Sequence, residues 1–165
     1  MSRLLKFAST LLVAASLVTG AAQAQDRRSG PSYGEATLSD GFTNDIMLEV
    51  LAGGPVRILP MRGCPGGGYI NAAPSFRVHY RAGEWPLIFY VRAHPRDTIL
   101  LVNDPAGHWH CNDDYQGLDP AIQFAITVEN SHILSGEYNV WVGSYGPEGV
   151  LGAMLYITST RPFFR

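Results

Sequence analysis

The stretch SFRVHYR, residues 75–81, decides the fold class that we predict for this chain. Three apolar side chains alternate along it with three basic ones, Phe76, Val78 and Tyr80 against Arg77, His79 and Arg81. A period of two places successive side chains on opposite faces of a strand, whereas a helix would scatter both sets around its axis. The stretch therefore predicts a β-strand with one buried face and one face in water.

Short apolar runs separated by turn residues continue this pattern along the chain. The runs cover residues 46–52, 55–59, 75–80, 86–92, 98–103, 121–126, 137–145 and 151–158. The runs at 86–92 and 98–103 are apolar on both faces, which indicates central strands that are covered on each side. Short strands at this spacing, with no convincing helix after residue 24, predict an all-β sandwich or barrel.

The first residues, 1–24, predict a secretory signal peptide. Arg3 and Lys6 precede an uncharged run over residues 7–19, and residues 22–24 (Ala-Gln-Ala) are typical of a cleavage site. The run is shorter than the roughly 20 residues that a membrane-spanning helix needs. We therefore expect cleavage after residue 24, no membrane span, and a bacterial protein that is periplasmic or secreted.

Composition divides the rest of the chain into an arm and one domain. Residues 25–45 are polar, contain several Gly and Ser residues and show no periodicity, so they predict a flexible N-terminal arm. Residues 46–160 hold all the predicted strands and are expected to form a single β-sandwich domain.

The charge balance bears on the class of partner. The chain has a formal net charge of −2 at pH 7, and loss of Arg3 and Lys6 would make it more acidic. A weakly acidic protein is a poor candidate for binding nucleic acid. Residues 97–160 contain no Lys or Arg and carry eight acidic residues. This stretch is either one end of a solvated sheet or an acidic rim that attracts cations.

Cys64 and Cys111 are the two cysteines of the chain. In an oxidising compartment an even pair predicts one disulfide. A disulfide between them would close a long loop and lower the entropy of the unfolded chain, which is worth roughly 4 kcal/mol in the standard loop model.

The stretch DPAGHWHCNDD, residues 104–114, concentrates the side chains that carry chemistry. Residues 104–107 predict a turn, since Pro presets one backbone angle and Gly accepts a positive φ. A strand starting at residue 108 would sort the next four side chains onto two faces, His108 and His110 on one, Trp109 and Cys111 on the other. The two imidazoles, with Asp113 as a third ligand, would suit zinc or copper. The alternative is a pair of exposed histidines without a metal.

The acidic residues that follow suggest a second kind of site. Asp113, Asp114 and Asp119 offer hard oxygen ligands in a loop, as calcium prefers, although their spacing matches no EF-hand. Consecutive Asn and Asp residues also stabilise turns through their own side chains, which is the alternative.

Aromatic side chains are candidates for a binding surface. Trp109, Tyr115, Trp141 and Tyr145 would provide amphipathic rings for a sugar or a peptide; core packing is the alternative for each. A serine nucleophile lacks its usual context, because Ser144 follows a predicted strand without the helix that a nucleophile elbow requires.

Five segments together resemble a known group of domains. They are GCPGGGYINAAPSFRVHY (63–80), LIFYVRAHPRDTILLVNDPAGHWHCNDD (87–114), LDPAIQF (118–124), SGEYNVWVGSY (135–145) and AMLYIT (153–158). These segments are similar to the bacterial pre-peptidase C-terminal (PPC) domain group. They resemble more closely a set of small exported proteobacterial proteins with the pattern D-T-x-L-L-V-N-x-P-x-G-x-W-x-C-[ND]-D-D. The match covers residues 63–158, and its densest part is 97–114.

The resemblance implies a jelly-roll-like antiparallel β-sandwich of about eight strands that is not itself an enzyme. Such domains usually accompany secreted peptidases, and similar sandwiches include collagen-binding modules stabilised by calcium. The positions that match are Asp97, Asp113 and Asp114 for calcium, and Cys64 with Cys111 for the bridge.

We therefore expect an exported, non-catalytic β-sandwich that binds a protein, peptide or glycan at the cell envelope, with calcium as a stabilising ion. The predicted calcium ligands are Asp97, Asp113, Asp114 and Asp119. The alternative is a small secreted hydrolase or metalloenzyme that uses His108, His110 and Asp113.

Overall fold

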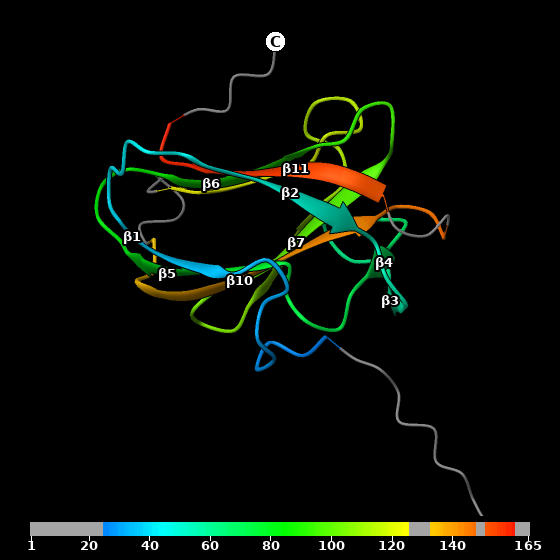
Figure 1. Ribbon diagram of the computed structural model, residues 1–165, viewed down its shortest axis with the longest axis horizontal. Coiled ribbons are helices and arrows are strands. Elements are labelled where there is room, and N and C mark those ends of the chain that lie inside the picture. The colour runs from blue at the N-terminus through cyan, green and yellow to red at the C-terminus, as the bar shows by residue number, and fades with distance from the viewer. Residues whose placement is uncertain (1–24, 126–132, 148–150, 161–165) are drawn as a thin grey trace, which may run out of the picture.

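Two β-sheets packed face to face form the described part of the molecule (Figure 1). The computed structural model describes residues 25–125, 133–147 and 151–160, which contain eleven strands. The all-β sandwich predicted from the sequence is thereby confirmed. The predicted signal peptide, residues 1–24, lies outside the described residues. Within the described ranges, no helix is long and apolar enough to cross a membrane.

The larger sheet, sheet A, has seven strands. Their order is β1, β5, β10, β7, β8, and the short strands β4 and β3 adjoin the end of β10 at Ser144. The pairing of β1 with β5 is parallel and the other pairings are antiparallel. The bounds are β1 Glu35–Ser39, β3 Val56–Ile58, β4 Gly68–Ile70, β5 Phe76–Arg81, β7 Thr98–Asn103, β8 Trp109–Asn112 and β10 Gly136–Ser144.

The smaller sheet, sheet B, has four antiparallel strands in the order β2, β11, β6, β9. The bounds are β2 Ile46–Ala52, β6 Leu87–Arg92, β9 Ala121–Phe124 and β11 Leu151–Thr158.

The main core lies between the two sheets and follows the alternation of the strands. On β5, Phe76, Val78 and Tyr80 are buried while Arg81 is exposed, as the pattern of residues 75–81 predicts. Strands β6 and β7 are buried over nearly their whole length, and each lies inside its sheet. On the outer face of β6, Ile88 and Tyr90 are buried against Ala121 and Tyr156 of the neighbouring strands.

All eight predicted strand runs appear in the structure, and β1, β4 and β8 add to them. The prediction of a flexible arm over residues 25–45 is wrong for residues 35–39, which form β1. The segment Glu-Ala-Thr-Leu-Ser carries a single large apolar side chain, so it lacks a clear strand pattern. It is ordered by its parallel pairing with β5, from Glu35 opposite Arg77 to Ser39 opposite Arg81.

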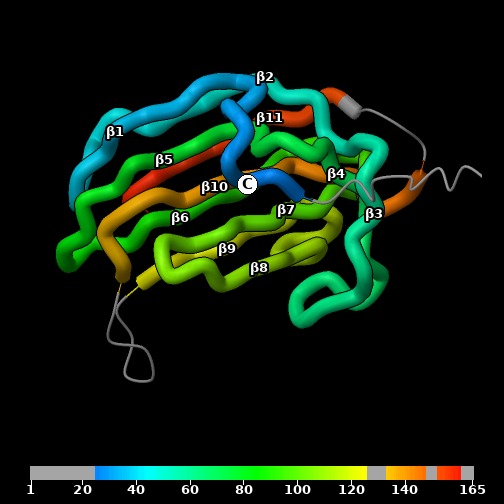
Figure 2. The backbone as a smooth tube through the Cα atoms, turned by 90° about the horizontal axis from the view of Figure 1, so that it is seen from below, coloured from blue at the N-terminus to red at the C-terminus, as the bar shows by residue number. Residues whose placement is uncertain are grey.

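The outer face of sheet A is covered by the chain itself. The β3–β4 hairpin and its following loop close over a second apolar cluster that contains Leu101, Trp141 and the disulfide Cys64–Cys111, with 5.6 Å between the two Cα atoms. The predicted disulfide is thus confirmed. Gly63 has a φ of 86°, and a Cβ there would collide with the carbonyl oxygen of Cys111, so the bridge needs glycine at this turn. Figure 2, which views this side, shows the N-terminal segment passing over β10.

Candidate functional site

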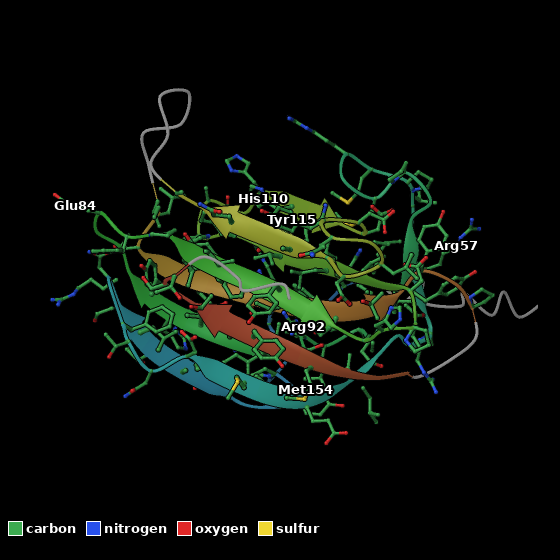
Figure 3. The ribbon with its side chains drawn as sticks, turned by 90° about the horizontal axis from the view of Figure 1, so that it is seen from above. Arg57, Glu84, Arg92, His110, Tyr115 and Met154 are labelled. Atoms are coloured by element: carbon green, nitrogen blue, oxygen red, sulfur yellow. A yellow bond between two sulfur atoms is a disulfide. The ribbon has the colours of Figure 1, made fainter. Side chains whose placement is uncertain are left out.

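The outer face of sheet B carries a groove of about 680 Å³ that we call the sheet-B groove. Its titratable lining residues are Glu49, Arg92, His94, Arg96 and Asp119, and the thioether of Met154 lies among them. Figure 3 faces this side and shows Arg92 and Met154 on it. A volume of this size lies in the range typical of small-ligand sites.

Strand register places three groove residues in one row across sheet B. Met154 of β11 lies opposite Glu49 of β2 on one side and opposite Arg92 of β6 on the other. Neighbouring strands lie about 4.8 Å apart, so the backbones at Glu49 and Arg92 are about 10 Å apart. An acidic and a basic side chain therefore flank an apolar one on the same surface.

The remaining basic residues come from the turn that follows β6. The Arg96 amide donates to the Ala93 carbonyl at 2.9 Å, which closes this turn. The Ala93 amide donates to Asp119 Oδ1 at 3.1 Å, and the Val91 amide donates to the Pro120 carbonyl at 3.0 Å. These bonds fix the loop before β9 against the end of β6, so this wall of the groove is held in place by hydrogen bonds.

A tyrosine pair borders the groove at Arg92. The rings of Tyr90 and Tyr156 are stacked, with centroids 4.5 Å apart and planes within 3° of parallel. The guanidinium carbon of Arg92 lies 6.0 Å from one centroid and 5.9 Å from the other. Near-equal distances place it alongside the pair, not over the outer face of either ring. We therefore assign the rings mainly a packing role against the Arg92 stem, with little cation–π attraction.

The charges of the groove balance, and one carboxylate, Glu49, lies apart from the arginines. The two arginines, Arg92 and Arg96, offset the two carboxylates, Glu49 and Asp119, in formal charge. Asp119 shares the loop end with the two arginines, while Glu49 is the titratable residue that lines the groove from β2. Among the described residues, no ion pair within 4.0 Å joins Glu49, His94 or Arg96 to any partner.

A second hollow, of about 510 Å³, lies on the outer face of sheet A beneath the N-terminal segment. Its central side chain is Arg77, which is 12% exposed. Arg77 Nε donates to Asn139 Oδ1 at 2.7 Å, and its Nη2 donates to the carbonyl oxygens of Arg27 and Ser29 at 2.7 and 2.9 Å. Glu137 adds an ion pair at 3.5 Å. We call this network the Arg77 clamp; its polar atoms are used to hold the N-terminal segment on the sheet.

The two histidines of residues 104–114 converge on Asp104, not on Asp113 as the metalloenzyme alternative requires. Asp104 Oδ2 lies 2.9 Å from His110 Nε2 and 3.4 Å from His108 Nδ1, and Asp104 Oδ1 accepts the His108 amide at 2.9 Å. The Asp113 amide instead donates to the Gly63 carbonyl. Burial raises the pKa of Asp104, but the His110 hydrogen bond, the His108 amide and the two imidazole charges outweigh it and lower the pKa overall.

The predicted calcium ligands are not gathered into one set. Across the described ranges, no group of three or more His, Cys, Asp or Glu residues could hold a metal ion. Asp119 Oδ1 accepts the Ala93 amide at 3.1 Å, a hydrogen bond that joins two loops far apart in the sequence. The sites proposed for Asp97, Asp113 and Asp114 stay predictions, which melting with calcium and with a chelator would test.

The four predicted binding aromatics occupy different environments. Trp141 is fully buried, packs against Trp109 and donates Nε1–H to the Ala72 carbonyl at 3.3 Å. Trp141 is therefore a core residue, and its predicted contact with a ligand is wrong. Tyr115 and Tyr145 are exposed, and Trp109 is exposed in part.

Ser144 is also buried, and its hydroxyl donates to the Gly146 carbonyl at 2.8 Å. This agrees with the absence of an elbow motif around it in the sequence.

Sequence reasoning missed the groove, although one signal for it was present. Arg92, His94 and Arg96 recur at alternate positions where a strand ends, and such a run at a strand end brings basic groups to one rim. Glu49 gave no signal, because its position opposite Arg92 depends on strand register.

No protein-family model matches the chain, and a search of curated proteins found no significant match.

Proposed function

We propose that this protein is an exported, non-catalytic β-sandwich module that binds a ligand of the cell envelope, a protein, peptide or glycan, in the sheet-B groove. The observation that carries the proposal is the set of groove charges, since Glu49 and Arg96 form no ion pair with other described residues. Charged side chains held on a fixed surface without internal partners are available to a ligand.

Two further features support a binding role. The hydrogen bonds of Ala93 and Val91 preorganise the wall at the end of β6, which lowers the entropy lost on binding. The resemblance of residues 63–158 to PPC domains implies a non-catalytic module, and the signal peptide predicted over residues 1–24 would direct it to the envelope.

Array binding of the purified, labelled chain tests the proposal. Peptides and glycans printed on one array are probed with the native protein and with the double variant Arg92→Ala/Arg96→Ala. We expect bound spots for the native chain that lose most of their signal with the variant. Spots of equal strength for both proteins would remove the groove as the binding site, and an array without binding would remove the binding function.

The alternative, a small hydrolase or metalloenzyme, is motivated by the convergence of His108 and His110 on Asp104. Purified protein assayed on casein and on ester substrates distinguishes the two functions. Turnover that disappears in His110→Ala or Ser144→Ala, or zinc bound in equal amount to the protein, would replace the binding module with the enzyme.

A further inference from the structure

We infer that the sheet-B groove selects a peptide segment carrying both signs of charge, with a carboxylate toward Arg92 and Arg96 and a basic side chain toward Glu49. The inference rests on the proposed binding function and specifies the ligand of the same site.

The row across sheet B determines the spacing of the two ligand charges. Glu49 and Arg92 lie on either side of Met154, two strands apart, or about 10 Å between backbones. An extended peptide advances about 3.3 Å per residue, so about three residues cover this distance. An acidic and a basic residue separated by one to three others would reach both ends, because their side chains are themselves long.

The separation of charge in the groove favours a dipolar ligand over a ligand of one sign. A purely acidic ligand would gain contacts at Arg92 and Arg96 but would bring a second negative group toward Glu49. A purely basic ligand would gain a contact at Glu49 but would bring a second positive group toward Arg92 and Arg96. Like charges facing each other across an interface oppose binding, whereas complementary charges fix the register of the partner.

The apolar side chain in the middle of the row favours a peptide over an acidic glycan as the ligand. Met154 separates the two charged ends, and the exposed apolar side chains Met47 and Leu51 flank Glu49 on the same face of β2. Methionine adapts its shape to apolar side chains of different size. A peptide supplies such a side chain between two opposite charges, while an acidic polysaccharide repeats one sign of charge on a polar chain.

The experiment uses three peptides with blocked ends, so that only side chains carry charge. They have the sequences Glu-Leu-Ala-Lys, Glu-Leu-Ala-Gln and Gln-Leu-Ala-Lys, and an oligogalacturonate serves as the acidic glycan. Binding is followed by NMR titration of backbone amides in the purified chain. We expect the first peptide to bind about tenfold more tightly than the other two, a difference of about 1.4 kcal/mol, and to shift groove amides.

Variants assign each ligand charge to its end of the groove. In Glu49→Gln the affinity of the dipolar peptide should fall to that of the acid-only peptide, whose own affinity should not decrease. In Arg96→Gln the affinity of the dipolar peptide should fall toward the affinity of the base-only peptide. Glu84→Gln and Arg57→Gln are matched controls, since both side chains are exposed and Figure 3 shows them at the two ends of the molecule, away from Arg92.

The outcomes separate the inference from the proposed function. Equal affinity for the three peptides, or shifts of groove amides by oligogalacturonate with none by the peptides, would overturn the dipolar ligand while leaving a binding groove. No shift with any probe, together with a blank array, would overturn both.

Discussion

The outer faces of the two sheets differ in how far their polar side chains are bonded within the fold. On sheet A, chain segments cover the face, and Arg77 directs its donors at Asn139 and at the carbonyls of Arg27 and Ser29. On sheet B, the groove brings charges of both signs to one surface, and among the described residues Glu49 and Arg96 form no ion pair.

We infer from this difference that the outer face of sheet A contributes to stability and the outer face of sheet B to binding. A polar side chain whose hydrogen bonds are completed within the fold contributes to stability, and its removal leaves buried partners unsatisfied. A charged side chain held at the surface without a partner contributes little to stability. Substitutions on sheet A should therefore change the free energy of unfolding, and those in the groove should change binding.

The largest effect is expected from the disulfide that fastens the cover of sheet A. Replacing both cysteines, Cys64→Ser with Cys111→Ser, opens a loop that spans 47 residues. The free energy of unfolding should fall by about 4 kcal/mol, mainly because the unfolded chain gains entropy. Urea denaturation followed by tryptophan fluorescence measures the change, and reduction of the native protein with a thiol should reproduce it. A loss below about 1 kcal/mol would show that the cover is held mainly by packing.

The Arg77 clamp should give the next largest effect. Arg77→Met keeps the apolar stem but removes the donors to Asn139, Arg27 and Ser29. Hydrogen bonds to a charged group contribute about 1.5–3 kcal/mol each, and partial solvation of the carbonyls recovers some of this, so we expect a loss of about 3 kcal/mol. Arg77→Lys should recover only part of the loss, because an ammonium lacks the planar fork that spans three acceptors.

Asp104 should give a smaller effect that depends on pH. Its lowered pKa means that the folded state favours the carboxylate, so its stabilisation is fully present above the unfolded pKa, about 3.9, and is lost as the pH falls through the folded value. Asp104→Asn should destabilise the protein by about 1–2 kcal/mol near pH 6. The difference from the native chain should shrink below about pH 4. Urea midpoints from pH 6 to pH 3 would show it; a difference constant over this range would contradict the assignment.

The sandwich could be predicted from the sequence because its strands alternate, as in Phe76, Val78 and Tyr80, or are apolar throughout. Strand β1 could not, since residues 35–39 become a strand only through pairing with β5. The disulfide could be predicted from the number of cysteines, given the signal peptide that the sequence predicts. The groove could not be predicted, because it depends on long-range strand register. Glu49 and Arg92 are 43 positions apart in the chain and lie on either side of β11. The sequence pointed to Asp113 as the partner of the histidines because it follows them closely in the chain, while the turn at 104–107 folds Asp104 back onto them.

The smallest change in stability is expected in the groove, and it tests the comparison most directly. The double variant Glu49→Gln/Arg96→Gln removes one charge of each sign, keeps the net charge of the chain and leaves similar side-chain volumes. Because neither side chain pairs with another described residue, the free energy of unfolding should change by less than about 0.5 kcal/mol, even though binding of the dipolar peptide should be lost. Urea denaturation and peptide titration of the same preparation measure both quantities. A loss of stability near that of Arg77→Met would mean that the groove charges hold the fold together, and the two faces would then no longer differ in kind.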